Sequence, residues 1–446
     1  MSDWEFFCKK FETIICTHKE LASLRIELFR TQQRNACLST LKIMYWTLKL
    51  IRGKCLFKKR QPHTGHSIYF IPNDLATQLG TLQSLFSRDA TSTLIATQQL
   101  FRCKKFVQIQ KQYDTYNYEN YLDFHYKDLK NCFHLTKKIS KNVELPFHVV
   151  LASVFKHLMS KNSFEYLFNK INAQFYFSTM DNSMDCGLAI YYAKQMKMHN
   201  YILQHGALVP EYVPVTTDNY IVWGSVAKTW FINHHVGCKL LALGTPRIDQ
   251  IYILKKQEDM FSYQLREKYN IPSDKKIFLF LSHSKALEFG IDVHIKNFEA
   301  LKTVINNPSY QLVVKLHPLE KQSLFNKILD DQKKRIILLP KDDDIYQTIL
   351  ASDICASTFS TTLVEAMCLG KPTIQMNMAQ INNLPDYSQQ DGCIYVDTPN
   401  TLNYILNKKD LSTELERQNA YVKKYFNNLG HSTDCIIDLI NKIANL

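Results

Sequence analysis

The chain has 446 residues, of which 46% are hydrophobic, and this is long enough to bury two cores. Lysine and arginine total 54 against 41 acidic residues, and the net charge of +13 favours anionic, phosphorylated or membrane-surface partners. The 12 cysteines form no CxxC pair, which argues against a zinc or disulfide framework and favours a reducing compartment.

The first 64 residues predict a helical extension. Their apolar positions recur at helical spacing, and few turn residues interrupt them. The N-terminus lacks the continuous apolar core and the small-residue cleavage site of a secretory signal. We therefore expect a cytoplasmic protein.

Residues 36–60, ACLSTLKIMYWTLKLIRGKCLFKKR, are the stretch of this extension that comes nearest to a membrane segment. Lys42 and Lys49 break the apolar run well short of the roughly 20 residues that a spanning helix needs. The basic and aromatic residues fit an amphipathic helix that lies peripherally on an anionic inner membrane, with Tyr45 and Trp46 on its apolar face. A basic helix packed on the body of the protein fits the same pattern.

From residue 65 onward, short apolar runs alternate with helix-length segments. The first series runs through HSIYFIPND, KFVQIQ, AQFYFSTM, NYILQHG, NYIVWGS and CKLLALG, and the second through KKIFLFLSHS, YQLVVKLHP, RIILLPKDDD, DICAST, PTIQMN and GCIYVD. Such alternation predicts parallel βαβ units, and therefore two doubly wound α/β domains with a cleft between them. We place the helical extension at 1–64, the N-terminal domain at 65–255 and the C-terminal domain at 256–446.

Ligands of open α/β sheets bind beyond the carboxyl ends of the strands, so the residues after each apolar run are the candidates. In the second series, Lys315 ends a strand and His317 and Pro318 follow it, where an imidazole can contact a nucleotide phosphate. Ser282 follows another strand and can add a hydrogen bond to the donor.

Five hydroxyl residues between Ser357 and Thr362 gather at the N-terminus of a predicted helix that stops at Gly370. Free backbone N–H groups at a helix N-terminus bind phosphate, and Ser360, Thr361 and Thr362 add donors there. Thr362 and Glu365 also fit a capping box, which would give them a purely structural role.

The triple aspartate at 342–344 superficially resembles a metal-binding motif. It stands immediately before a predicted helix, where Asp344 fits an ordinary N-cap. We expect no metal site.

Polar residues also follow the strands of the first series. Gln204, His205 and Gly206 end one strand, and the glycine permits a close backbone approach beside a histidine that can act as an acid or base. Asp181 and Asp185 follow another strand, and each can serve as a general base or cap the next helix.

The segment after the last strand of the first series contains Thr245 and Arg247, which we place in the cleft. Arg247 can bind a phosphate through two hydrogen bonds, or it can pair with Asp249 as a structural hinge.

In this order, the motifs resemble those of bacterial GT-B transferases that make capsules, lipopolysaccharide and teichoic acids. The resemblance covers about residues 170–380 and rests on YILQHG, Trp223-Gly224, LGTPRID, VVKLHP and STFSTTLVEAMCLGKP. It implies an α/β GT-B fold with two Rossmann-like doubly wound domains.

The site residues implied by the resemblance differ between branches of this group. In the sialyltransferase-like and Kdo-transferase-like branches, a His-Pro motif and a Ser/Thr cluster hold the donor phosphate, and a glutamate lies near the ribose. Those roles fall here to His317, Pro318, Ser360, Thr361, Thr362 and Glu365. In the CDP-glycerol glycerophosphotransferase-like branch, the motifs at 205–206 and 244–249 recur.

We therefore expect a metal-independent glycosyltransferase that uses a nucleotide sugar, for example a CMP-sugar, and no further cofactor. The expected acceptor is a glycan or a lipid-linked molecule in bacterial surface polysaccharide synthesis, and no nucleic acid is expected as a partner. Asp181, Asp185 or His205 would take the acceptor proton. The alternatives are a CDP-polyol phosphotransferase of teichoic-acid type, a nucleotide-sugar 2-epimerase-like isomerase and a non-catalytic carbohydrate-binding relative.

Overall fold

The structure is a computed structural model, and the chain in it forms two compact units. Unit 1 comprises Met1–Arg247 and Thr433–Leu446, and unit 2 comprises Ile248–Ser432. The residues that the structure describes are 3–16, 18–31, 36–56, 61–72, 76–89, 91–282, 291–317, 320, 322–328, 330–340, 343–358, 360–381, 387 and 392–445.

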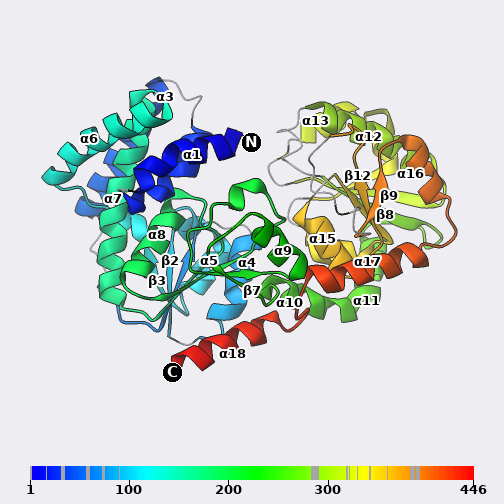
Figure 1. Cartoon of the computed structure of the whole chain (residues 1–446). Helices are drawn as coiled ribbons and strands as arrows, with labels where there is room; N and C mark the ends of the chain where they lie inside the picture. The colour runs from blue at the N-terminus through cyan, green and yellow to red at the C-terminus, as the bar shows by residue number, and fades with distance from the viewer. Residues whose placement is uncertain are drawn as a thin grey trace. The chain divides into compact units, whose positions relative to one another are not determined.

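Unit 1 is built on a parallel sheet in the order β3-β2-β1-β4-β5-β6-β7 (Figure 1). Its strands follow the short apolar runs of the sequence because a strand buried on both faces needs apolar side chains at consecutive positions. The strands are β1 (Ser67–Ile71), β2 (Ser92–Ala96), β3 (Asp114–Asn117), β4 (Phe175–Ser178), β5 (His199–Leu203), β6 (Asn219–Val222) and β7 (Lys239–Ala242).

Helices cover both faces of this sheet. One face packs mainly on the long helix α7 and on α8, and the other on α4, α5 and α18. The helices of unit 1 and its shorter 3-10 segments are α1 (Asp3–Ile15), η1 (Lys19–Leu24), α2 (Arg25–Arg30), α3 (Ala36–Leu56), α4 (Ala76–Phe86), η2 (Leu100–Arg102), α5 (Lys104–Ile109), η3 (Tyr118–Tyr121), α6 (Tyr126–Val143), α7 (Phe147–Ile171), α8 (Met184–Gln195), η4 (Pro210–Tyr212), α9 (Ser225–Asn233) and α18 (Ser432–Ala444). Helix α10 (Pro246–Tyr252) begins at the end of unit 1 and continues into unit 2.

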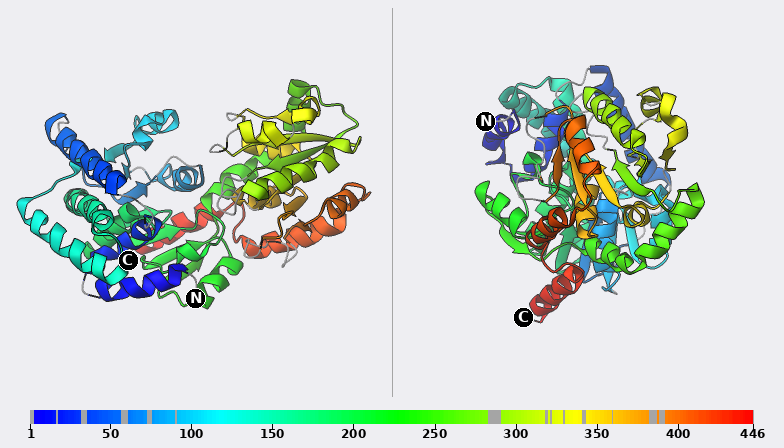
Figure 2. Two further views of the ribbon diagram at one scale, coloured as in Figure 1. Left: turned by 90° about the horizontal axis from the view of Figure 1, so that it is seen from above. Right: turned by 90° about the vertical axis from the view of Figure 1, so that its right-hand side faces the viewer.

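Unit 2 is built on a second parallel sheet, in the order β10-β9-β8-β11-β12-β13. Helices cover both of its faces as well (Figure 2). Its elements are η5 (Ile253–Gln257), α11 (Glu258–Tyr269), β8 (Lys276–Leu281), α12 (Ile291–Asn306), β9 (Tyr310–Lys315), α13 (Gln322–Ile328), η7 (Asp330–Arg335), β10 (Ile336–Leu338), α14 (Ile345–Ala351), β11 (Ile354–Ser357), α15 (Thr361–Cys368), β12 (Thr373–Met376), β13 (Ile394–Val396), α16 (Pro399–Leu406) and α17 (Ser412–Tyr425).

Both sheets reverse their direction of winding next to their first strand. In unit 1 the chain adds β2 and β3 on one side of β1 and then β4 to β7 on the other, and in unit 2 it does the same around β8. The reversal leaves a crevice at the carboxyl end of the sheet, between β1 and β4 and between β8 and β11. These two edges are where the polar residues after the strands lie.

The observed units differ from the predicted boundaries at two points. The first unit ends at Arg247, where we had predicted 255, and the C-terminal helix returns to unit 1. It returns because Ile436 and Ile440 of α18 join the apolar core below the sheet of unit 1, beside Leu82 and Phe106. Local periodicity cannot show which of two sheets a terminal amphipathic helix will cover.

Two strands were not predicted from the sequence. β2 and β3 flank residues 105–110, which belong largely to helix α5. β3 has the polar sequence DTYN, and only its last two residues are buried, because it lies at the edge of the sheet. An edge strand of this kind carries little of the apolar signal that marks the inner strands.

Helix α3 packs on the body of unit 1 through one face, where Trp46 is buried in the core beside α7. The opposite face is apolar and exposed. Six large side chains there are each at least half accessible to solvent, namely Leu38, Leu41, Met44, Tyr45, Leu48 and Ile51. In the described part of the chain, no helix is long and apolar enough to cross a membrane.

Candidate functional site

The carboxyl edge of the sheet in unit 2 brings three predicted residues onto neighbouring strands. Ser282 follows β8, His317 follows β9, and Ser360 follows β11 shortly before α15. The backbone N–H of Ser282 donates to the carbonyl of Lys315 at 3.0 Å, which extends the strand pairing to the edge of the sheet. Pro318, also predicted for this site, lies outside the described residues.

A buried carboxylate fixes the backbone at His317. Oε2 of Glu320 accepts a hydrogen bond from the His317 N–H at 3.0 Å and a very short one from the Ser282 hydroxyl. The Ser282 hydroxyl oxygen also accepts from the His317 N–H, at 2.9 Å. Nδ1 of His294, on α12, lies 3.2 Å from Oε1 of the same carboxylate. Burial raises the pKa of Glu320 and lowers the pKa of His294.

Glu320 and His294 were not predicted from the sequence. Glu320 stands alone in the loop after β9, and His294 lies inside a helix of mixed composition. The sequence feature that could have indicated Glu320 is its position three residues after His317. This spacing allows a carboxylate to accept from a backbone N–H earlier in the chain, as in a capping box.

Lys315 has a structural role in this geometry. Its side chain is largely buried, and Nζ donates to the carbonyls of Pro340 and Asp343 at 2.5 and 2.8 Å. The lysine therefore ties the end of β9 to the loop after β10. Asp344 caps α14 as predicted, because its carboxylate accepts from the N–H groups of Tyr346 and Gln347.

The hydroxyl cluster lies at the start of α15. Ser360, and not Thr362 as the capping-box interpretation required, is the N-cap, since its hydroxyl accepts from the Thr362 N–H at 3.1 Å. Thr361 and Thr362 are partly exposed in the first turn, whereas Glu365 is buried one turn further on. The start of α15 thus presents two hydroxyl groups and the positive end of the helix dipole.

In unit 1, His205 lies just beyond the end of β5. Its Nδ1 atom lies 2.6 Å from the backbone carbonyl of Thr179, which ends the neighbouring strand region. A carbonyl only accepts, so Nδ1 carries the proton and the lone pair of the neutral ring is on Nε2. The ring of Tyr212 packs edge-on against the imidazole, at 5.5 Å between centroids.

Gln204 holds the backbone that carries this histidine. The side chain is buried; its amide nitrogen donates to the Gly206 carbonyl at 3.0 Å, and its amide oxygen accepts from the Trp223 N–H at 3.0 Å. The indole N–H of Trp223 donates to the Gln204 carbonyl at 2.7 Å. The two strand ends that carried the QHG and Trp-Gly motifs are therefore bonded to each other.

Asp181 and Asp185 occupy different surroundings. Asp181 is buried, and Oδ2 accepts from the backbone N–H of Thr216 at 2.6 Å and from its hydroxyl at 3.1 Å; burial raises its pKa, against these hydrogen bonds. Asp185 pairs with Lys156 of α7 at 2.8 Å. Neither caps α8, because the N-cap is Ser183.

Gly187 lies in the first turn of α8, where the helix passes close to η1. A Cβ atom at Gly187 would lie 2.8 Å from Cβ of Ser23, so the glycine allows α8 to pack closely on η1. The close packing of these two elements therefore requires a glycine at position 187.

Thr245 and Arg247 are both buried near the end of unit 1. Asp249 accepts a hydrogen bond from the backbone N–H of Ser432 at 3.1 Å, within unit 2. Among the described residues, no group of three or more histidine, cysteine, aspartate or glutamate side chains is arranged to hold a metal ion.

The whole fold resembles several solved structures. UDP-GlcNAc 2-epimerase from Neisseria meningitidis matches with a TM-score of 0.58 and 15% identity, over 84% of this chain and 100% of that one. UDP-GlcNAc 2-epimerase from Methanocaldococcus jannaschii matches with a TM-score of 0.57 and 14% identity, over 85% and 100%. The wall teichoic acid polymerase TagF matches with a TM-score of 0.51 and 14% identity, over 92% and 97%. These likenesses confirm the predicted α/β GT-B fold and, at such identities, nothing beyond the fold.

A search of curated proteins by similarity gave no match. One family model, described as CDP-glycerol:poly(glycerophosphate) glycerophosphotransferase, matches residues 106–428. Of the branches that the motifs resemble, this match supports the CDP-glycerol branch and gives no support to the sialyltransferase-like one. Because it spans well over half of the chain and includes both His205 and His317, the chain belongs to the CDP-glycerol:poly(glycerophosphate) glycerophosphotransferase family of transferases.

Proposed function

We propose that this protein transfers a polyol phosphate from a CDP-activated donor to a hydroxyl group of an acceptor. The observation that carries the proposal is the family match over residues 106–428, which includes the strand-end histidines of both units. The first of the alternatives drawn from the sequence thereby replaces nucleotide-sugar glycosyl transfer as the main hypothesis.

In this proposal His205 is the general base. Its Nδ1 proton is committed to the Thr179 carbonyl, so the ring is held in the tautomer that has its basic lone pair on Nε2. The hydrogen-bonded backbone around Gln204 keeps the ring in place. Asp181 instead holds the backbone at Thr216, and we assign it no proton transfer.

The donor diphosphate is assigned to the edge of unit 2. The first turn of α15 offers the hydroxyls of Thr361 and Thr362 together with backbone N–H groups, and His317 faces the same edge from β9. Glu320 and Ser282 position His317 through its backbone. These groups stabilise negative charge on the leaving phosphate without a metal ion in the step.

The reaction balances as a single phosphoryl displacement. The acceptor oxygen attacks the phosphorus atom that carries the polyol, while Nε2 of His205 takes the proton of the acceptor hydroxyl. The bond from that phosphorus to the bridging oxygen breaks, and CMP leaves with the electron pair. The product is a phosphodiester between acceptor and polyol.

Glycosyl transfer from a nucleotide sugar is the second candidate. It rests on the motif resemblance to nucleotide-sugar transferases, in which Glu365, buried one turn into α15, corresponds to the carboxylate near the ribose. This reaction would add no phosphorus to the acceptor, and it would release CMP from a CMP-sugar or UDP from a UDP-sugar. The nucleotide product and the new bond therefore separate the two candidates.

The test incubates the full chain with CDP-glycerol and a short poly(glycerol phosphate) acceptor. The expected result is release of CMP together with a new phosphodiester signal in the ³¹P spectrum. A panel of CMP, CDP, UDP, GDP and dTDP in thermal-shift assays should show stabilisation by cytidine nucleotides, lost in His317→Ala and kept in the control His234→Ala, whose histidine is exposed in unit 1. Stabilisation by UDP alone, or turnover of a nucleotide sugar without acceptor, would reject the proposal.

We also propose that the exposed face of α3 rests on an anionic membrane surface. The six exposed apolar side chains recur at helical spacing from Leu38 to Ile51, and basic residues of the sequence follow them at the same end. Such an apolar stripe can enter the acyl-chain region of a bilayer, while the neighbouring basic residues bind the anionic lipid headgroups.

Sedimentation with phosphatidylglycerol and phosphatidylcholine vesicles tests this contact. We expect binding to the anionic vesicles, and loss of binding in Leu38→Asp/Leu41→Asp but not in Ile232→Asp/Ile253→Asp, which alters exposed apolar residues elsewhere. If the wild-type chain does not bind vesicles but forms a concentration-dependent dimer that the first variant cannot form, the apolar stripe is a dimer interface and the membrane proposal is wrong.

A further inference from the structure

Unit 1 contains a cavity of about 690 Å³ where helix α3 faces the carboxyl edge of its sheet. Pro72 follows β1, Thr97 follows β2 and Tyr118 follows β3, and all three line it. The Thr97 hydroxyl donates to the Pro72 carbonyl at 3.2 Å, which joins the first two strand ends. The volume lies within the range of about 300–1,000 Å³ typical of ligand sites.

The cavity has an excess of positive charge. Four cationic side chains line it, Lys49, Arg52, Arg102 and Lys156, against the two carboxylates of Glu119 and Asp185, so cationic groups outnumber anionic ones by two. Each carboxylate is already paired with a lysine. Lys49 forms a close ion pair with Glu119, and Lys156 pairs with Asp185 at 2.8 Å. The side chains of Arg52 and Arg102 add two guanidinium groups to the same lining.

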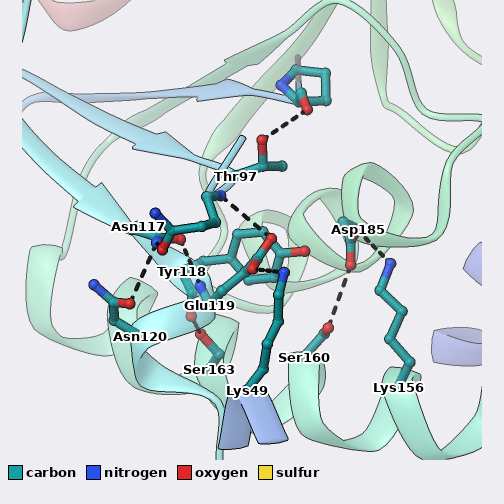
Figure 3. Close-up of polar contacts among 12 residues, drawn as sticks. Lys49, Thr97, Asn117, Tyr118, Glu119, Asn120, Lys156, Ser160, Ser163 and Asp185 are labelled. Carbon is teal, nitrogen blue, oxygen red and sulfur yellow. Dashed lines mark hydrogen bonds and ion pairs between the residues drawn. The ribbon is translucent and has the colours of Figure 1, made fainter. Parts of the chain in front are cut away.

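Hydrogen bonds and ion pairs join several side chains of the cavity wall to one another (Figure 3). Trp46 is buried and lies within cation–π distance of both lysines, at 4.7 Å from Lys49 and 4.9 Å from Lys156. Oε1 of Glu119 accepts from the Gln98 N–H at 3.3 Å, and the Gln98 side chain accepts from Asn117 at 2.6 Å. A preformed site loses little conformational entropy on binding.

These lining groups match an anionic chain that is rich in hydroxyls. Guanidinium groups bind phosphate through paired hydrogen bonds, and paired carboxylates and side-chain amides accept from or donate to hydroxyls. Gln99 and Asn120 supply such amides at the cavity wall. A chain of polyol or sugar units joined by phosphodiesters combines both features.

Much of this cavity lies outside the family match, which begins at residue 106. Helix α3, the end of β1 and the segment 97–102 all precede it. The cavity also shares the carboxyl edge of one sheet with His205, because β1 and β5 are separated only by β4. The cavity therefore lies on the same sheet edge as the proposed base.

We propose that this cavity binds the phosphodiester-linked body of the acceptor chain, at a distance from the hydroxyl that reacts. The inference rests on the proposed function, and it adds a second acceptor site to it. Acceptors of several repeats would occupy both the cavity and the edge at His205, whereas an acceptor of one repeat would reach only the latter.

The test measures binding of a six-unit poly(glycerol phosphate) chain, without donor, by isothermal titration calorimetry. The variant is Arg52→Gln/Arg102→Gln, in which both residues are exposed, and the control is Lys104→Gln/Lys105→Gln, which removes equal charge from exposed positions on neighbouring α5. We expect the dissociation constant of the variant to rise by about tenfold or more, corresponding to lost charge-assisted hydrogen bonds, and that of the control to change by less than about twofold.

Kinetics provide the second measurement. In the arginine variant, KM for the six-unit acceptor should rise by about tenfold with kcat unchanged, because only uniform binding is lost, and KM for a one-unit acceptor should not move. If the variant and the control lose the same affinity for the six-unit chain, the loss comes from the lower net charge and not from the cavity, and the proposal is wrong. Intact chain binding without CMP release from CDP-glycerol would reject the proposed function alone, and CMP release with unchanged chain binding in the variant would reject the cavity alone.

Discussion

Nδ1 of His205 donates a hydrogen bond of 2.6 Å to the backbone carbonyl of Thr179. The bond fixes both the orientation of the imidazole and its tautomer, since the carbonyl has no proton to offer. It also links the ends of two neighbouring strands, β4 and β5, at the carboxyl edge of one sheet.

His205→Gln should lower kcat for polyol-phosphate transfer by about 10²–10⁴, the usual contribution of a general base. Stabilisation by CDP should persist, because the donor is assigned to unit 2. The control His199→Gln replaces the exposed histidine at the opposite end of β5 and should keep activity. Full activity in His205→Gln would remove the histidine from the mechanism and reopen the role of Asp185.

Glu320→Gln should weaken donor binding and lower stability. The glutamine amide keeps one acceptor oxygen, but it lacks the negative charge of the carboxylate that accepts from the His317 N–H and the Ser282 hydroxyl. We therefore expect the free energy of unfolding to fall by about 1–3 kcal/mol. Urea unfolding and the CDP-induced thermal shift measure the two effects. Glu267→Gln, which alters an exposed glutamate of α11, is the control and should change neither quantity.

Gly187→Ala should destabilise unit 1 by about 1–3 kcal/mol, because the new methyl group would overlap Ser23. Gly80→Ala is the matched control. Gly80 lies inside α4, and no atom outside its own helix turn lies within 4 Å of the place that a methyl group would take, so the substitution should stabilise by about 0.5–1 kcal/mol through helix propensity. Denaturant unfolding of both variants decides the point, and destabilisation of both by a similar amount would contradict the packing argument.

His157 should make unit 1 sensitive to acid. The ring is fully buried in α7, Nδ1 lies 3.3 Å from the Ser23 hydroxyl, and Nε2 meets no hydrogen-bond partner in the described part of the chain. Burial, reinforced by Lys161 and Lys156, lowers its pKa from 6.5 to about 3. The unfolded chain therefore binds a proton that the folded chain does not bind between these two values.

The contribution of the neutral His157 ring to the free energy of unfolding is fully present above pH 6.5. It is lost as the pH falls toward 3, by about 1.4 kcal/mol per pH unit. We expect the wild-type chain to be about 2 kcal/mol less stable at pH 5 than at pH 7 through this residue. Urea unfolding at both pH values measures this difference in the free energy of unfolding, which should be smaller in His157→Leu than in the wild-type chain. An equal pH dependence in the two proteins would assign the acid sensitivity to other groups.

The sequence by itself determined the fold class and the edges at which the chemistry lies. Inner strands of a parallel sheet are buried on both faces, so each leaves a short apolar run, and the residues after the run fall at the carboxyl edge. That is why His205, His317 and Ser360 could be placed from the sequence. The short edge strand β3 carried too little apolar signal to be recognised in the same way.

Only the tertiary structure decided which groups meet. Glu320 reaches His294 of α12 and Ser282 of β8, and Lys49 of α3 pairs with Glu119, 70 residues further along the chain. Local periodicity reports which face of an element is buried, whereas such pairs depend on how distant elements pack. The cavity beside α3 and the return of α18 to unit 1 were outside the reach of the sequence for the same reason.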